Sequence, residues 1–289
     1  MPESIRSHIA FVHNNAVTLC GGRVESGDSL STTSSCLVLD VENQRWEKNV
    51  IGDLTKSRTY PAAVSVENVG TYLIGGSGSS GTTSSTDFLA HGLTEWKAGP
   101  DLPVSIWYPC AVQISHLSFL VIHGSDIREY QVDVANPTSS SGWQEANKWP
   151  SLQTWRGYHP GCTLTADNKV VIAGGHSGGN SGTFLKSSEV LDLATRKVTN
   201  GGDMTSPKGY FHLATITLGG ATKIFAIGGD SGSSHVNSVA EEFHIANNSW
   251  TMAPTTLAEE KGFFGQVVIQ LERVCPNREG KGCRFKEKS

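Results

Sequence analysis

The sequence predicts an all-β protein, a β-propeller built from four-stranded antiparallel blades, and three observations predict it. A Gly-Gly doublet follows a short apolar run and recurs in steps of about fifty residues. A tryptophan stands after a polar turn in most of the repeats. Glycine and serine are abundant while charged residues make up only 17% of the chain, a composition that suits many short strands joined by turns.

The glycine doublets mark the ends of the second strands. A short apolar run that ends in glycine is typical of a buried strand rather than a helix. In the third repeat the doublet is reduced to His123-Gly124. We expect these glycines to be structural, because glycine tolerates backbone angles and close approaches that other residues resist. The complete doublets are Gly21-Gly22, Gly75-Gly76, Gly174-Gly175 and Gly228-Gly229.

The other strands are placed around the doublets. A first strand precedes each doublet, as in YPAAVSV and YFHLATI, and a Gly/Ser-rich loop then leads to a third strand such as EVLDL. A polar turn and a fourth strand follow, and Val198 opens that strand in the fourth repeat. Four strands in each radially repeated unit is the plan of a propeller. We expect the tryptophans that open the other fourth strands to pack between blades: Trp46, Trp96, Trp143 and Trp250.

Together, the doublets and the tryptophans resemble the Kelch repeat family over roughly residues 6–271. The chain departs from the family pattern seven residues before the tryptophan, where apolar residues replace a tyrosine: Leu39, Leu89 and Phe243, with Leu191 in the repeat that lacks the tryptophan. The resemblance implies a Kelch propeller over residues 1–274, and a basic tail over 275–289.

The closure of the ring stays open at this stage. The chain holds five complete repeats and a sixth segment, FFGQVVI, that reads as a first strand. One alternative is a five-bladed ring with a surplus strand. The other is a six-bladed ring whose last blade comes from VVIQLERV and the tail as far as Phe285.

Strand alternation predicts the ligand face. In an antiparallel blade, the start of the first strand and the loop after the second strand lie at the same end. Most first strands start with a cation two positions before an aromatic residue or histidine, and residues i and i+2 of a strand point to one side. We therefore predict a basic, aromatic rim that binds a protein or acidic peptide; alternatively, the cations satisfy nearby carbonyls or acidic groups. The residues are Arg6, Arg58, Tyr60, Tyr108, Arg156, Tyr158, Lys208, Tyr210 and Lys261. Kelch propellers place arginines of this kind on their ligand face, which the resemblance implies here.

The third repeat breaks this pattern. Ile106 replaces the cation, Trp107 follows it, and the loop after the second strand shrinks to about SDI. The sequence predicts a gap in the rim with Trp107 exposed as a binding anchor. The alternative is a Trp107 packed into the scaffold.

The cysteines leave the compartment open, either cytoplasmic or secreted. No CxxC pair supports a zinc site. Cys110 and Cys162 hold near-equivalent positions in neighbouring repeats and are expected to be small core residues. Cys275 and Cys283 flank a turn-rich stretch and could form a local disulfide in an oxidising compartment. One N-glycosylation pattern occurs, Asn247-Asn248-Ser249.

Function follows as an expectation: a monomeric interaction scaffold or adaptor module, with no metal and no cofactor. The alternative is a small-molecule enzyme, since Kelch-like rings also carry sugar oxidases and sialic acid mutarotases. For such chemistry His159 with His176, or Arg156 with Glu241 or Glu242, are the conceivable pairs. A net charge of −4 makes no case for nucleic acid, and no apolar run approaches the length of a membrane helix.

Overall fold

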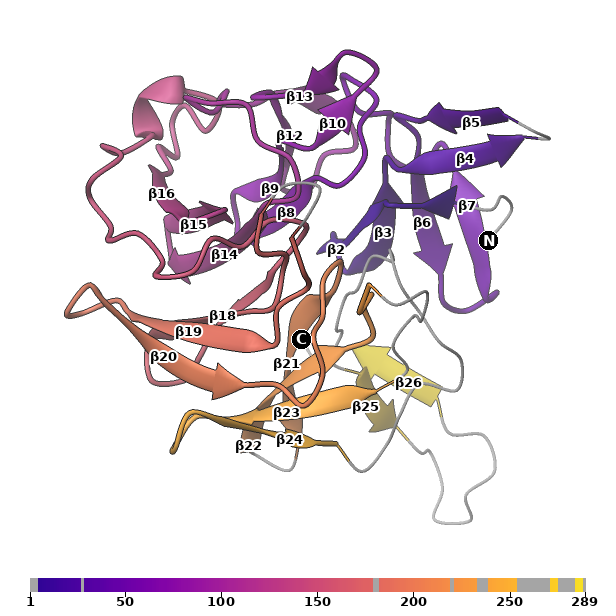
Figure 1. The fold of residues 1–289 in the computed structure, drawn as a ribbon. Coiled ribbons are helices and arrows are strands. Elements are labelled where there is room, and N and C mark those ends of the chain that lie inside the picture. Colours follow the sequence, from indigo (N-terminus) through magenta and orange to yellow (C-terminus); the bar gives the residue numbers. More distant parts are fainter. Residues whose placement is uncertain are drawn as a thin grey trace, which may run out of the picture.

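The computed structural model describes residues 5–26, 29–178, 182–218, 221–232, 239–253, 271–274 and 284–287. Within these residues the regular structure is all strand, apart from one 3-10 turn, η1 (Ser140–Gly142). Five antiparallel sheets are arranged around a common centre, and the first strand of each lies innermost (Figure 1). The all-β expectation is confirmed, and so are the four-stranded antiparallel sheets at four of the five predicted repeats.

We number the sheets 1 to 5 in chain order. In each one the strands pair in sequence order, so that every strand is hydrogen-bonded to the one before it. Sheet 1 holds β2 (Ile9–His13), β3 (Ala16–Cys20), β6 (Cys36–Asp40) and β7 (Arg45–Lys48), and sheet 2 holds β8 (Ala62–Val66), β9 (Gly70–Ile74), β12 (Thr86–Ala90) and β13 (Trp96–Ala98). Sheet 4 holds β17 (Gly161–Leu164), β18 (Lys169–Ala173), β19 (Ser187–Asp192) and β20 (Lys197–Asp203), and sheet 5 holds β21 (His212–Leu218), β22 (Ala221–Ile227), β23 (Ala240–His244) and β24 (Ser249–Met252).

Sheet 3 has three strands where the sequence predicts four: β14 (Cys110–Ser115), β15 (Ser118–His123) and β16 (Asp126–Gln131). The expected fourth strand is reduced to one bridge between Tyr130 and Trp143. The long connection before Trp143 contains Pro137, which has no N–H for a strand ladder, and it ends in η1. The indole of Trp143 still packs on the ring of Tyr130, with the ring centres 5.0 Å apart.

The hydrophobic core lies between consecutive sheets. One cluster joins sheet 1 to sheet 2, and further clusters join sheets 2 and 3, sheets 3 and 4, and sheets 4 and 5. The predicted tryptophans take part. Trp96 of sheet 2 contacts Phe11 of sheet 1 edge-on at 5.9 Å, and the indole N–H of Trp250 donates to Ser188 of sheet 4 at 2.9 Å. Trp46 packs beside a small apolar cluster within sheet 1.

The glycine doublets of sheets 1, 2 and 4 each bond to the start of the next sheet. The N–H of Gly76, the second glycine, donates to the carbonyl of Ile106 at the start of sheet 3, at 2.9 Å. A Cβ on Gly76, whose φ is +94°, would lie 2.5 Å from the carbonyl oxygen of Thr59. Only glycine fits this backbone angle and this approach. The doublets of sheets 1 and 4 make the same bond to the starts of sheets 2 and 5.

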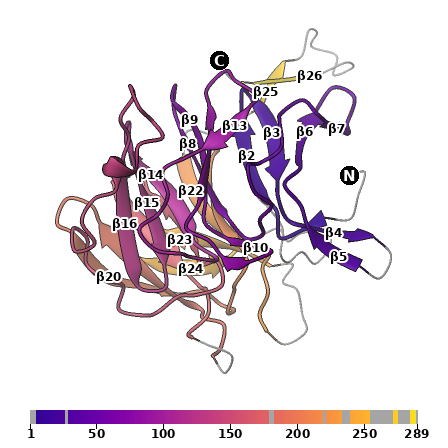
Figure 2. The same cartoon turned by 90° about the horizontal axis from the view of Figure 1, so that it is seen from above.

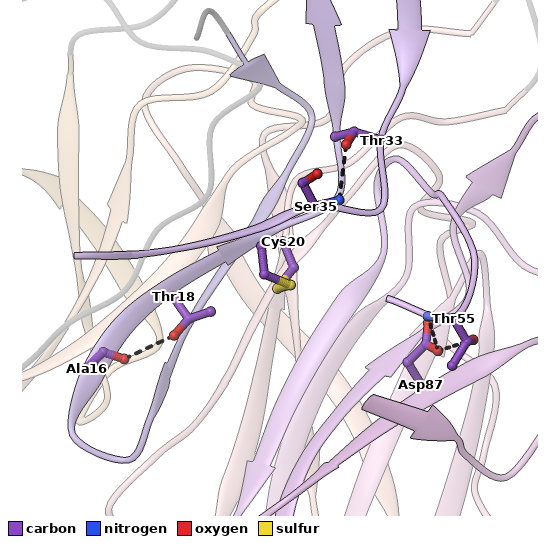
Figure 3. The surroundings of a disulfide bond; sticks show 8 residues. Ala16, Thr18, Cys20, Thr33, Ser35, Thr55 and Asp87 are labelled. Atoms are coloured by element: carbon purple, nitrogen blue, oxygen red, sulfur yellow. Dashed lines mark hydrogen bonds between the residues drawn. A yellow bond between two sulfur atoms is a disulfide. The ribbon is translucent and has the colours of Figure 1, made fainter. Parts of the chain in front are cut away.

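Two disulfides lie in this scaffold. Cys20–Cys36 links neighbouring strands of sheet 1 (Figure 3), and Cys110–Cys162 links the first strands of sheets 3 and 4. The expectation that Cys110 and Cys162 are merely small core residues is therefore wrong. Their near-equivalent places in adjacent sheets bring the two sulfurs together across the junction. The predicted pair Cys275 and Cys283 lies outside the described residues.

Short hairpins extend the loops after the second strands. β4 (Arg23–Ser26) pairs with β5 (Ser29–Thr32) and with β1 (Ile5–Arg6), and β10 (Ser77–Gly78) pairs with β11 (Gly81–Thr82). Figure 2 shows β4, β5 and β10 at the same end of the main strands. This is the end at which the first strands begin, as alternation predicts.

Near the C-terminus, β25 (Leu271–Val274) pairs with β26 (Arg284–Glu287). This pairing crosses the predicted boundary between residues 274 and 275, so part of the expected tail belongs to a two-stranded sheet. The segment FFGQVVI lies outside the described residues, and the closure of the ring stays a prediction.

Candidate functional site: an aromatic face at the starts of the first strands

Four tyrosines stand directly before the first strands of sheets 2 to 5. Each of them has a left-handed backbone, with φ of 54° at Tyr60, 54° at Tyr108, 48° at Tyr158 and 53° at Tyr210. Such angles are uncommon for bulky residues and cluster at functional positions. Because the same turn is repeated in four sheets that surround one centre, it directs the four rings toward each other.

The tyrosine rings form one cluster. The centres of Tyr60 and Tyr108 are 4.4 Å apart, and Tyr108 lies 5.0 Å from Tyr158 and 5.3 Å from Tyr210. The hydroxyl of Tyr210 donates to that of Tyr108. Burial, and to a lesser extent Tyr60, raises the pKa of Tyr108 to about 12, so this phenol is neutral at physiological pH.

A cavity of about 360 Å³ lies along the first strands of all five sheets. Among its lining residues are Ile9, Ala62, Leu213 and both cysteines of the Cys110–Cys162 disulfide. Tyr60 and Tyr210 line a smaller cavity that shares Ile9 and His212 with the large one. The tyrosine cluster therefore lies at the end of the central cavity where the strands begin.

Two histidines lie beside the tyrosines, of which His159 is buried and His212 is half-buried. His159 is an extra residue between Tyr158 and Pro160, with no counterpart in the other repeats, and its ring lies 6.1 Å from that of His212. Burial, and then the proximity of His212, lowers the pKa of His159 to about 3. Burial, and then the charge of His8, lowers the pKa of His212 to about 4. These histidines are neutral at physiological pH.

Trp107 and Trp155 are exposed beside the cluster, by 41% and 40%. The ring of Trp107 lies 5.1 Å from that of Tyr108. Trp155, which the sequence analysis did not single out, lies over two glycines: a Cβ on Gly124 or Gly157 would come within 2.5 Å or 2.4 Å of its indole. The predicted exposure of Trp107 is confirmed. The set Tyr60, Trp107, Tyr108, Trp155, Tyr158 and Tyr210 is called the aromatic face below.

The gap in sheet 3 explains this exposure. The loop after its second strand consists of Gly124 and Ser125 alone, whereas sheet 2 has the β10–β11 hairpin at this place. In the other repeats the residue that follows the position of Arg58 pairs with the loop after the second strand, as Thr59 does with Ser77. A short loop leaves uncovered the indole of Trp107 at the start of sheet 3 and that of Trp155 at the start of sheet 4.

A polar groove of about 400 Å³ lies on the same side of the molecule, between the chain that leads to Tyr60 and the β10–β11 hairpin. Hydroxyl groups of Ser57, Ser79 and Thr82 line it, together with Lys56. Nearby, the guanidinium of Arg23 lies over the ring of Tyr60, 6.0 Å from its centre. The aromatic face thus adjoins groups that donate and accept hydrogen bonds.

Three of the cations predicted for the basic rim are buried and do not form a rim. The side chains of Arg58, Arg156 and Lys208 are 0% exposed. Each is paired with an acidic residue of its own sheet: Arg58 with Asp87 at 2.5 Å, Arg156 with Glu189 at 3.0 Å and Lys208 with Glu241 at 3.3 Å. The alternative reading, that these cations satisfy acidic groups and carbonyls, is the correct one for these residues.

The two arginines also bind backbone carbonyls. Arg58 donates to the carbonyls of Gly75 and Ser85, and Arg156 donates to those of Gly174 and Ser187. Burial lowers the pKa of both arginines, and their carboxylate partners oppose that effect. These cations therefore connect the strand start to the glycine doublet and the third strand.

Arg6 occupies a different position from the other predicted cations. It pairs with Arg23 across the β1–β4 ladder, as Thr59 pairs with Ser77 in sheet 2. Ile5 is therefore the structural equivalent of Arg58, and Ser7, with φ of 60°, is the equivalent of Tyr60. The side chain of Arg6 is 53% exposed and lies 4.0 Å from Glu25. Lys261 lies outside the described residues.

The acidic partners carried a signal that the sequence analysis overlooked. Each acid is the first or second letter of a predicted third strand: TDFLA, EVLDL and EEFHI. Where the cation is absent in sheet 1, the equivalent of Asp87 is Leu37, as the registers of β3 with β6 and β9 with β12 show. A cation at the strand start thus occurs together with an acid on the third strand.

The pairs considered for enzyme chemistry do not assemble. Glu241 is bound to Lys208 and Arg156 to Glu189, while Glu242 is paired with Lys223 at 3.0 Å. The ring of His176 contacts Tyr158 at 4.7 Å, whereas His159 faces His212. Among the described residues, no group of three or more His, Cys, Asp or Glu side chains is arranged to hold a metal ion.

The chain matches none of the protein-family models against which it was compared, and the comparison with curated proteins found no match. In the described part of the chain, no helix is long and apolar enough to cross a membrane.

Proposed function

We propose that the chain is a Kelch-like β-propeller that acts as an interaction module and binds a peptide segment of another protein on its aromatic face. The fold part of this proposal is supported by five sheets around one centre, with first strands that line a common cavity. It is also supported by the glycine doublets of sheets 1, 2 and 4, which bond to the start of the next sheet.

The exposed pair Trp107 and Trp155 carries the functional part. Tryptophan is enriched among the residues that dominate binding energy, and loops on a rigid scaffold are where binding usually resides. The indole of Trp107 packs on the buried Tyr108, and that of Trp155 lies against Gly124 and Gly157, so ordering them on binding costs little side-chain entropy. The adjoining polar groove provides hydroxyl groups for a peptide backbone.

Fewer cations are accessible to an acidic peptide than the sequence predicted. Arg58, Arg156 and Lys208 are neutralised inside the scaffold and cannot attract a ligand at contact range. Arg23, over the ring of Tyr60, is the cation that an acidic side chain of the peptide would meet.

A selection from a displayed random-peptide library on the folded chain tests the proposal. We expect the selected peptides to bind the Trp107→Ala and Trp155→Ala variants at least about 30-fold more weakly, the loss typical of a hot-spot residue. Leu93→Ala is the matched control, because Leu93 is 51% exposed and lies in the turn between β12 and β13, at the other end of the strands. Selected peptides that bind all three variants equally would contradict the proposal, as would a selection that yields none.

A further inference from the structure

The turn between β23 and β24 carries the asparagine of an N-glycosylation sequon, Asn247-Asn248-Ser249. This is the single Asn-X-Ser/Thr pattern in the chain with X other than proline, since Asn136-Pro137-Thr138 is excluded by its proline. The side chain of Asn247 is exposed. The sequon therefore lies in a surface turn, where a bulky glycan can be accommodated.

The local geometry leaves the reacting atom accessible. The hydroxyl of Ser249 donates to Oδ1 of Asn247 at 2.8 Å. Among the described residues, the amide nitrogen Nδ2 of Asn247 has no hydrogen-bond partner. Asn248, with φ of 51°, turns the chain back into β24. The carboxamide is thus held by its oxygen and free at the nitrogen that carries the sugar in an N-linked glycan.

The disulfides provide a second, independent observation. Cys20–Cys36 and Cys110–Cys162 pair all four of the described cysteines. Disulfides form and persist in oxidising compartments such as the lumen of the endoplasmic reticulum. N-glycosylation takes place in the same compartment, so the sequon and the disulfides point to one route of maturation.

We propose that Asn247 is an N-glycosylation site. Nδ2 of Asn247 attacks the anomeric carbon of a lipid-linked oligosaccharide: the N–C bond forms, the bond from that carbon to the pyrophosphate oxygen breaks, and the lipid pyrophosphate leaves. The amide proton passes to a base of the transferase. No oxidant or reductant takes part.

The position of the glycan is compatible with ligand binding. Asn247 lies in a turn between third and fourth strands, and such turns are at the opposite end of the strands from the aromatic face. The proposal does not depend on what that face binds. A glycan on Asn247 leaves Trp107 and Trp155 uncovered.

Translation of the full chain behind a cleavable secretory leader, in the presence of endoplasmic-reticulum microsomes, tests the proposal. Only chains protected from added protease are scored, so that every scored chain has been translocated. We expect one glycan in most of these chains, removed by peptide N-glycosidase, which converts the linked asparagine to aspartate at position 247.

Matched variants separate the sequon from the fold. Asn247→Gln and Ser249→Ala should abolish the modification, whereas Asn248→Gln and Ser249→Thr, which preserve the pattern, should retain it. Translocated wild-type chains without a glycan would overturn the proposal. So would a glycan that persists in both Asn247→Gln and Ser249→Ala.

Discussion

Replacement of Arg58 by isoleucine tests whether the cations at the strand starts are structural. Ile5 stands at the equivalent position of sheet 1, so the apolar side chain fits this kind of site. Arg58→Ile removes the ion pair with Asp87, whose side chain is 0% exposed, and the three hydrogen bonds to Gly75 and Ser85. It leaves a carboxylate buried without its counter-charge.

The expected cost follows from that burial. Removing one partner of a buried ion pair destabilises a protein by about 3–5 kcal/mol, because the other charge stays desolvated. The double variant Arg58→Ile/Asp87→Leu copies the pair Ile5 and Leu37 of sheet 1 and removes both charges. It still deprives Thr55 of the acceptor for its N–H and hydroxyl (Figure 3), so some loss remains. We expect the double variant to be more stable than the sum of the single changes by about 2–3 kcal/mol.

Urea unfolding under non-reducing conditions measures these differences, with the slope m checked for constancy among the variants. Arg45→Ala is the control, because Arg45 lies 2.7 Å from Glu47 but is 66% exposed, and exposed pairs contribute little. If Arg58→Ile and the control unfold at the same urea concentration, the assignment of Arg58 to a buried structural pair is wrong. Binding by the aromatic face should be unchanged in any Arg58 variant that folds.

Three further predictions concern stability. His8, His159 and His212 have pKa values below the ordinary 6.5, so between pH 6.5 and about 4 they take up protons only after unfolding. The free energy of unfolding should therefore fall by about 1.4 kcal/mol per pH unit for each histidine as the pH drops through this range. Urea unfolding curves that do not move between pH 7 and pH 5 would contradict this. The Cys110→Ala/Cys162→Ala variant should lose about 4 kcal/mol, the loop-closure value for a separation of 52 residues, with urea midpoints as the measure. Gly76→Ala should lose at least about 1–3 kcal/mol, and Gly81→Ala, with a similar φ of +98° but no atom within 4 Å of a Cβ, should lose less; equal losses would assign the effect to backbone angle alone.

The sheets could be predicted because their signals are local and repeated. A glycine doublet at the end of a short apolar run indicates a strand end, since Gly76 occupies an angle and a close approach that other residues cannot. Alternation then places the loops and strand starts at one end, as β4, β5 and β10 confirm. The absence of a fourth strand from sheet 3 could not be predicted in this way, because Trp143 is present there and yet forms only a single bridge.

The basic rim failed for a definable physical reason. The prediction took the strand start as extended, so that Arg58 and Tyr60 would share one side. The left-handed turn at Tyr60 breaks that alternation, sends the tyrosine to the central cluster and leaves the arginine inside its own sheet. A hydrophobic or charged pattern does not reveal such a turn. Pairing each cation with the acid of the third strand, such as Asp87, would have revealed the ion pair.

The third repeat departs from the pattern of a cation at the strand start, and this departure explains the exposed part of the candidate site. Where a cation is present, it ties the strand start to the third strand through a buried acid, as Arg156 and Glu189 do in sheet 4. In sheet 3, Ile106 fills that place as a buried apolar residue, and Arg128 stands where sheets 2, 4 and 5 carry the acid. The loop that would cover this start is shortened to two residues, and the indole of Trp107 is exposed in consequence.

Exposure of this kind has a cost for a folded chain, because large apolar groups are favoured inside. Trp155, at the start of sheet 4, is also exposed, and its indole lies against Gly124 of the same shortened loop, where the lack of a Cβ provides the room. A single exposed tryptophan needs no explanation, but two beside one shortened loop form a coherent surface, and Trp107 packs on Tyr108, whose backbone conformation is strained. The repeat that contributes least to the regular scaffold is therefore the one from which we expect the specificity of binding to come.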